Sequence, residues 1–250
     1  VGPYWSITKF DDIMAVDTNH KVFSSEAKLG GIAIQDMHSV EGGLELEMFI
    51  AMDPPKHDQQ RKAVTSAVAP SNLQLLEPTI RERACQILDD LPVGEDIDWV
   101  DKVSIELTTM TLATLFDFPW EERRKLTRWS DITTAAPETG IVESYDARRE
   151  ELIECAMYFK GLWEQRINEE PKNDLISIMA HSPATRDMPF LEFLGNLLLL
   201  IVGGNDTTRN SISGGVLALN QNPDEYRKLN GDPSLITSMV PEIIRWQTPL

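Results

Sequence analysis

The sequence of 250 residues has few of the residues from which common metal sites are built. It holds two cysteines, Cys85 and Cys155, and neither has a second Cys or a His at the spacing of metal ligands. Both lie in helical patterns, so we expect buried structural thiols, and two unpaired cysteines are typical of a reducing, cytoplasmic compartment. The histidines do not cluster along the chain either: His20, His38, His57 and His181. A zinc site built from these residues is therefore not expected.

Several motifs of well-known function are also missing. The sequence has no phosphate-binding loop, no G-x-G-x-x-G after a strand and no G-x-S-x-G elbow. The net charge is −17 without a basic stripe, which argues against nucleic acid as a partner. We see no signal peptide, and the longest uncharged run, near Leu197, is too short to span a bilayer.

What is present is mostly helical periodicity. The first fifty residues are mixed, with alternation typical of an edge strand at residues 5–8, and the rest follows a helical period. We predict a mainly α fold with a small N-terminal β portion, as one partial domain over residues 1–250 that is truncated at both ends. The predicted helices cover residues 11–16, 53–69, 71–91, 103–115, 121–129, 144–168, 174–180, 189–221, 224–229 and 234–247.

The most informative segment lies in the middle of the helix predicted over residues 189–221. Two glycines, Gly203 and Gly204, are followed closely by Asp206, Thr207 and Thr208. Each glycine inside a helix costs about 1 kcal/mol relative to alanine. Thr207 can donate to the carbonyl four residues earlier. The pattern favours a helix that a reacting group approaches closely; the alternative is a Gly-Gly break with Asp206 as the N-cap of a second helix.

Two charged pairs each share one face of a predicted helix. His57 and Arg61 are four residues apart and can bind one anionic group together; the alternative is a solvated surface pair. Glu242 and Arg245 are three residues apart among apolar neighbours. This setting favours a buried ion pair with a structural role over an ordinary surface pair.

These three features, in this order, resemble a cytochrome P450. Residues 53–61 resemble the family's helix that holds the haem propionates, residues 203–208 its oxygen-activation helix, and residues 242–245 its Glu-x-x-Arg motif. The resemblance covers essentially the whole chain. Residues 14–20 and 203–211 further resemble the bacterial alkane-hydroxylase branch, although bacterial steroid and fatty-acid hydroxylases have similar central helices.

The resemblance implies a haem-thiolate monooxygenase with haem b as cofactor. It implies that His57 and Arg61 bind the propionates and that Gly203 and Gly204 let the helix lie against the haem. The residues that it assigns to oxygen activation and proton delivery are Asp206, Thr207 and Thr208, and those that it assigns to structure are Glu242 and Arg245.

The resemblance also implies an apolar substrate, for which the terminal position of a medium-chain alkane is the first expectation. From helix phase we expect Leu199 and Val202 to line the pocket, together with Ile32 of the loop near Gly31. The reaction would use O2 and electrons from a ferredoxin and its NAD(P)H-dependent reductase, or from a fused reductase domain.

One departure from the family concerns the iron ligand. The family's axial Cys lies in a Gly-rich loop well beyond the Glu-x-x-Arg helix, and neither Cys85 nor Cys155 lies in such a loop. We therefore expect no metal ligand in this sequence and an axial Cys beyond Leu250. The full-length parent would be an enzyme, whereas these 250 residues alone would be inactive. An all-helical, non-catalytic binding protein is the alternative of another class.

Overall fold

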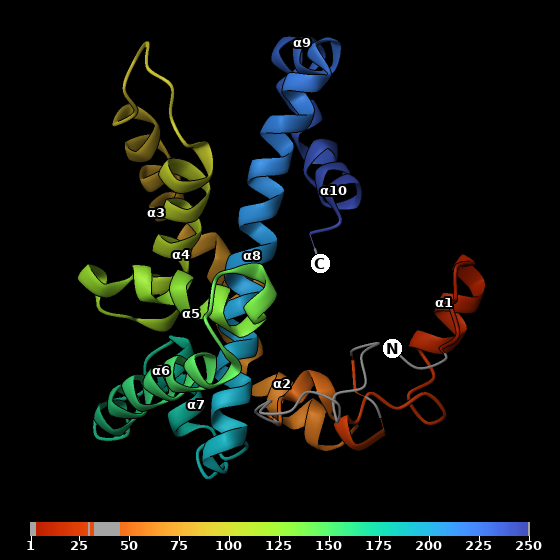
Figure 1. Ribbon diagram of the computed structural model, residues 1–250, viewed down its shortest axis with the longest axis vertical. Helices are drawn as coiled ribbons and strands as arrows, with labels where there is room; N and C mark the ends of the chain where they lie inside the picture. Colours follow the sequence, from red (N-terminus) through yellow and green to blue (C-terminus); the bar gives the residue numbers. More distant parts are fainter. Residues whose placement is uncertain (1–3, 30, 33–45, 250) are drawn as a thin grey trace. The chain divides into compact units, whose positions relative to one another are not determined.

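The structure, a computed structural model, describes residues 4–29, 31–32 and 46–249 and is almost entirely helical (Figure 1). No strand occurs within these ranges, so the predicted N-terminal β portion is not confirmed. Residues 5–8 have no regular secondary structure. A strand needs a neighbouring strand to satisfy its backbone groups, and alternation in one short segment cannot supply that partner.

The predicted helices are present with shifted ends. They are α1 (Phe10–Asp17), α2 (Lys56–Thr65), α3 (Pro70–Asp89), α4 (Glu106–Phe116), α5 (Arg124–Thr134), α6 (Tyr145–Arg166), α7 (Leu175–His181), α8 (Phe190–Gln221), α9 (Pro223–Gly231) and α10 (Ile236–Gln247). A π-helical segment, Val100–Ile105, leads directly into α4. The second helix begins after Pro54 and Pro55 rather than with them, because a residue that precedes proline is disfavoured in the helical conformation.

The chain forms two compact units, and each is described by itself. Unit 1 comprises Val1–Leu73 and Asp131–Leu200, and unit 2 comprises Gln74–Ser130 and Ile201–Leu250. Helix α8 therefore contributes its first half to unit 1 and its second half to unit 2. It is one continuous helix, so the alternative of a break at Gly203 and Gly204 is wrong.

Unit 1 packs α6, α7 and the first half of α8 around an apolar core. The side chains that are almost fully buried there include Leu152, Phe159, Ile176, Met179, Leu194, Leu197 and Leu198. Ser144 caps α6 by accepting from the Ala147 amide, and Asp174 caps α7 by accepting from the Ser177 amide. These caps define where the helices around the core begin.

Unit 2 packs α4 against the second half of α8 in antiparallel register. Ser104 accepts from Ser213 at 2.8 Å, and one turn further along, Thr108 donates to Asn205 at 3.3 Å. Leu112, another turn along α4, lies against Gly204. Ser104, Thr108 and Leu112 are four residues apart and so share one face, and the last two contact Asn205 and Gly204 at the centre of α8.

The two cysteines differ in burial. Cys155 on α6 is buried as predicted, and burial raises the pKa of its thiol. Cys85 on α3 is exposed, so the prediction of burial was wrong there. The side chain that α3 buries is Ile87, two residues further on and therefore on another face of the helix.

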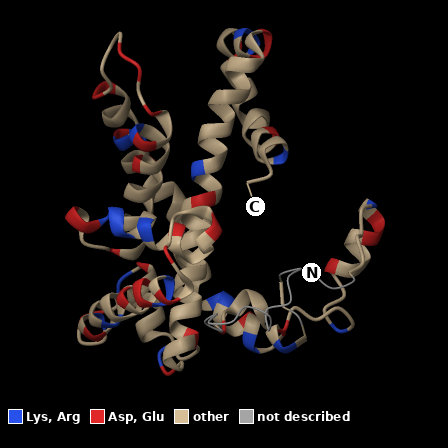
Figure 2. Cartoon of the chain, viewed as in Figure 1, with Lys and Arg blue, Asp and Glu red and all other residues tan. Residues whose placement is uncertain are grey.

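Acidic residues are spread over the helices of both units (Figure 2), as expected from the net charge of −17. In the described part of the chain, no helix has the length and hydrophobicity needed to cross a membrane. Within the same residues, no group of three or more His, Cys, Asp and Glu side chains is arranged to hold a metal ion.

Candidate active site

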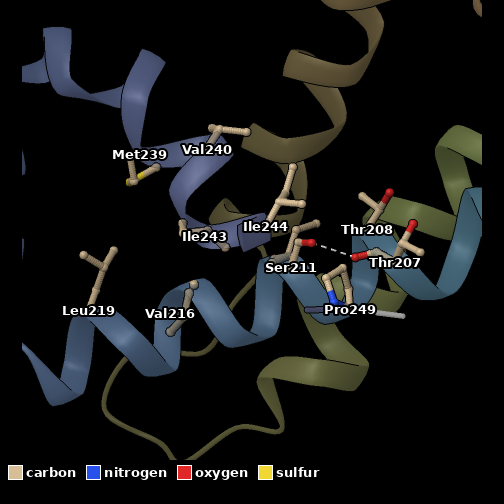
Figure 3. Close-up of a pocket in the computed structure, with 12 residues that line it drawn as sticks. Thr207, Thr208, Ser211, Val216, Leu219, Met239, Val240, Ile243, Ile244 and Pro249 are labelled. Atoms are coloured by element: carbon tan, nitrogen blue, oxygen red, sulfur yellow. Dashed lines mark hydrogen bonds between the residues drawn. The ribbon is translucent and has the colours of Figure 1, made fainter. Parts of the chain in front are cut away.

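The centre of α8 keeps its hydroxyl groups bonded within the helix. Thr207 Oγ1 donates to the Gly203 carbonyl at 3.1 Å, which confirms the predicted bond to the residue four positions earlier. Ser211 Oγ then donates to the Thr207 carbonyl at 2.8 Å, and this bond is drawn in Figure 3. Such bonds satisfy a hydroxyl without a partner from another element. The helix can therefore present these residues along a surface that no other segment has to cover.

The two glycines at the centre of α8 have different surroundings. A Cβ at Gly204 would lie 2.6 Å from Leu112 Cδ1, so the absence of a side chain there lets α4 and α8 approach closely. A Cβ at Gly203 would have no atom within 4 Å. Sequence reasoning gave both glycines the same role. Only Gly203 leaves space where a flat ligand could approach the helix.

Asp206 is held by three donors on a single carboxylate oxygen. Its Oδ1 accepts from Ser130 Oγ at 2.9 Å and from Asn205 Nδ2 at 3.1 Å. Arg209 completes the set at 3.0 Å, and the Asp206 and Arg209 side chains are only 14% and 16% exposed. Asn205 is fully buried and is itself bonded to Thr108. The Asp206 carboxylate is thus fixed through Oδ1, and Oδ2 accepts no hydrogen bond from the residues that the structure describes.

An apolar pocket of about 480 Å³ lies between the second half of α8 and α10 (Figure 3). Thr207 and Thr208 lie at one end of it and Leu219 at the other. The remaining lining residues are Ser211, Ile212, Gly215, Val216, Met239, Val240, Ile243, Ile244 and Pro249. The pocket therefore combines the two threonines singled out in the sequence with a wall of aliphatic side chains.

None of the predicted pocket residues lines this pocket. Leu199 and Val202 are partly buried on α8, and Ile32 is 57% exposed. Leu199 and Ile32 belong to unit 1, whereas Val202 and the pocket belong to unit 2. Their assignment to a substrate pocket stays a prediction.

Glu242 and Arg245 on α10 form the expected pair but in a different setting. Arg245 Nε and Nη2 donate to the two Glu242 oxygens at 2.7 and 2.6 Å, which lowers the pKa of Glu242. The two side chains are 59% and 65% exposed, so the prediction of burial was wrong. Trp246, which lies on the same face of α10 four residues after Glu242, is also exposed.

His57 and Arg61 lie on α2 in unit 1. The His57 side chain is 34% exposed, with Nδ1 2.8 Å from Asp58 Oδ1, and its ring meets the ring of Phe49 edge-on at 6.5 Å. Arg61 is exposed and forms no ion pair within the residues that the structure describes. A planar guanidinium that lacks an acidic partner can bind a carboxylate from a ligand.

Comparisons with known proteins show which proteins the chain resembles. No family model matches the chain. The chain is 30% identical over 254 residues to linalool 8-monooxygenase of Pseudomonas putida, covering 99% of this chain and 62% of the relative. It is 32% identical over 251 residues to a steroid C26-monooxygenase of Mycolicibacterium smegmatis, covering 99% and 57%. The chain thus spans about three fifths of the length of these curated relatives.

Solved structures agree with these relatives. Cytochrome P450-153 from Novosphingobium aromaticivorans matches with a TM-score of 0.86 and 46% identity, over 97% of this chain and 60% of that one. CYP153D17 from a Sphingomonas species matches with a TM-score of 0.84 and 46% identity, over 98% and 61%. The comparisons support the cytochrome P450 family. The helical fold is P450-like, and its relatives imply haem b as the cofactor.

Two described features, one in each unit, suit haem b, and an iron ligand is not among them. Arg61 offers a guanidinium for a carboxylate, and the open surface at Gly203 leaves space beside α8. Neither cysteine fits a thiolate ligand. Cys155 is buried within α6, where burial raises the pKa of its thiol, and Cys85 lies on α3 four residues before that helix ends at Asp89, so neither lies in a loop.

Proposed function

We propose that this chain forms part of a haem-thiolate monooxygenase that inserts one oxygen atom into an unactivated C–H bond of an apolar substrate. When bound, haem b would supply O2 binding and the oxidising power for this hydroxylation. The axial Cys would lie beyond Leu250. The named monooxygenases among the relatives favour this enzyme over a non-catalytic binding protein.

The proposed roles of the residues follow from their chemistry. His57 and Arg61 would bind the propionate carboxylates, Arg61 through its paired N–H donors. Gly203 would leave room for the haem face. Asp206, held through Oδ1, would take up and pass on a proton through Oδ2.

Thr207 would form the polar end of the site, and Thr208 is a second candidate for the same role. Both threonines line the apolar pocket (Figure 3). The observation that carries the proposal is the continuous path of α8 through residues 203–208, with Thr207 bonded back beside the open Gly203 surface. It is supported by a match to cytochrome P450 structures over nearly the whole chain.

For the substrate, we propose a medium-chain alkane hydroxylated at its terminal carbon. The identity to the two CYP153-type structures, 46%, exceeds the 30% and 32% found for the linalool and steroid enzymes. The steroid relative favours a steroid or fatty-acid hydroxylase as the second candidate. Electrons would come from a ferredoxin and its NAD(P)H-dependent reductase, or from a fused reductase domain. Product formation from octane, dodecanoic acid and a sterol, compared at equal concentration, tests this choice: octane should give the most.

The role of Thr207 is tested by Thr207→Ala in the intact haem-loaded protein. Loss of one hydrogen bond of about 1.4 kcal/mol corresponds to roughly a tenfold effect, so product formed per NAD(P)H should fall about tenfold while peroxide rises. The matched control is Thr208→Ala, which removes the neighbouring hydroxyl and should have a smaller effect. Unchanged coupling in Thr207→Ala contradicts the proposed role.

A further inference from the structure

A charged side chain that the proposed reaction does not use lies buried in unit 1. Glu192, in the first turn of α8, is 3% exposed. Its Oε2 accepts from Lys56 Nζ at 2.7 Å, and its Oε1 accepts from Gln60 Nε2. A buried carboxylate is tolerated only when it is paired and its oxygens are bonded. Lys56 Nζ also lies 3.5 Å from Glu47 Oε2. Desolvation lowers the pKa of Lys56, but the hydrogen bonds and charges of Glu192 and, to a lesser extent, Glu47 together raise it.

A second set of bonds starts one turn further along α8, at Asn196, and reaches Gln60 on α2 and Phe49 before α2. Asn196 is 1% exposed, and its Nδ2 donates to Gln60 Oε1 at 2.9 Å. The Asn196 carbonyl, Oδ1, accepts from the Phe49 amide at 2.7 Å. The Gln60 amide is therefore fixed from both ends, by Glu192 and by Asn196. Two successive turns of α8 are thereby bonded to two successive turns of α2.

The backbone before α2 is also held tightly against α8. A Cβ at Gly195 would overlap the carbonyl oxygen of Glu47, so only glycine permits this approach. The short helix that follows, Phe49–Ala51, carries the ring that meets His57 edge-on. The first half of α8 is therefore linked to His57 in two ways. Glu192 bonds the helix α2 that carries His57, and Asn196 bonds Phe49, whose ring contacts His57.

The direction in which His57 and Arg61 project depends on how α2 is rotated about its axis. Lys56 and Gln60 are four residues apart and lie on the face of α2 that bonds α8. His57 and Arg61 each follow one of these residues, so they lie about 100° further round the helix. One carboxylate that binds two residues a turn apart resists rotation of α2. The same contact therefore sets where His57 and Arg61 point.

We propose that Glu192 is a positioning residue that orients α2 so that His57 and Arg61 meet the carboxylates of the haem. The inference rests on the proposed function, in which these two residues bind the propionates. Glu192 acts through Lys56 and Gln60 and does not touch the haem itself.

The test compares haem b with its dimethyl ester, in which both carboxylates are blocked. The intact protein and its Glu192→Gln variant are each loaded with either haem, and haem loss to an excess of an acceptor haem protein is followed by absorbance. Replacing a group that orients a ligand typically costs tenfold or more in affinity, so haem b should leave Glu192→Gln about tenfold faster. The ester should leave the variant and the parent at equal rates. Equal acceleration for both haems would overturn the proposal, because it indicates general loosening.

Two further variants make the result decisive. Glu164→Gln removes an exposed carboxylate of unit 1, 65% exposed on α6, and should change neither rate. If Glu192→Gln fails to fold, the double variant Glu192→Gln with Lys56→Met removes both charges together and avoids an unpaired buried group. The double variant should show the same selective loss of haem b, and equal rates for the two haems would again overturn the proposal.

The proposed function is tested separately by His57→Ala combined with Arg61→Ala. The quantity to compare is the rate of haem b loss divided by the rate of ester loss. If this ratio is the same in the variant and in the parent, the proposal that these residues bind the propionates is wrong. If this variant shows the selective loss and Glu192→Gln does not, propionate binding stands and only the positioning role is wrong.

Discussion

The two halves of α8 use the same helical backbone for opposite purposes. In the first half, Leu194, Leu197 and Leu198 have no exposed surface, and buried polar groups are bonded to α2. In the second half, Gly203 faces open space and Leu217 is 58% exposed. The first half anchors unit 1, whereas the second half presents the candidate site in unit 2.

The difference lies in how polar groups are satisfied. Glu192 and Asn196 depend on partners from other segments, so their bonds fix the position of those segments. Thr207 and Ser211 bond to carbonyls of their own helix and leave that surface available to a ligand. Polar side chains of one helix can therefore either fix neighbouring segments or form part of a site. The difference is whether their hydrogen-bond partners belong to another segment or to the same helix.

The largest expected contrast between the halves is in their leucines. Leu197→Ala should lower the free energy of unfolding by about 3 kcal/mol, because it opens a cavity at a fully buried position. Leu217→Ala should change it by no more than about 0.5 kcal/mol. Denaturant unfolding of the intact protein measures both. Equal effects would show that the two halves are not different in packing.

The glycines give the next contrast. Gly195→Ala places a methyl group against the Glu47 backbone and should cost about 2 kcal/mol. Gly203→Ala meets no atom and should stabilise the haem-free protein by up to about 1 kcal/mol, the helix propensity of alanine over glycine. Thermal unfolding of the two variants without haem checks this. Destabilisation by Gly203→Ala would mean that its surface is covered.

The smallest effect concerns the segment before α2, whose contribution to stability should depend on pH. Ser24 Oγ and then the Ser25 amide donate to Asp53 and lower the pKa of its carboxyl. Asp53 therefore contributes stability above its unfolded pKa of about 3.9, and this is lost as pH falls through the lower folded value. Ser24→Ala should lower Tm slightly at pH 7, and the difference should vanish near pH 2. A difference that persists in acid would contradict this assignment.

Local patterns were enough to predict most helices. The prediction of residues 189–221 matches Phe190–Gln221 closely, and the bond from Thr207 to Gly203 follows from the helical repeat alone. Burial was harder to predict. Cys85 and the Glu242–Arg245 pair have apolar neighbours in sequence but are exposed, because exposure depends on which segments pack against a face.

The contacts that hold the candidate site residues in place were also hard to predict from sequence. Arg209 was missed although it lies three residues after Asp206, a spacing that signals a pair on a helix. Ser130 is 76 residues from Asp206, and Lys56 is 136 residues from Glu192. No local spacing could have joined these residues. The candidate site residues were predicted from sequence and stay predictions, whereas the residues that hold them in place required the structure.

The unequal burial of the two cysteines has a practical consequence. A thiol-reactive dye should attach to Cys85 in the native protein, because that thiol is exposed on α3. Cys155 is enclosed in α6 and kept protonated, so it can react only when its helix opens. The rate at which a dye attaches to Cys155 therefore measures how often unit 1 opens locally around α6. No substitution is needed for this measurement.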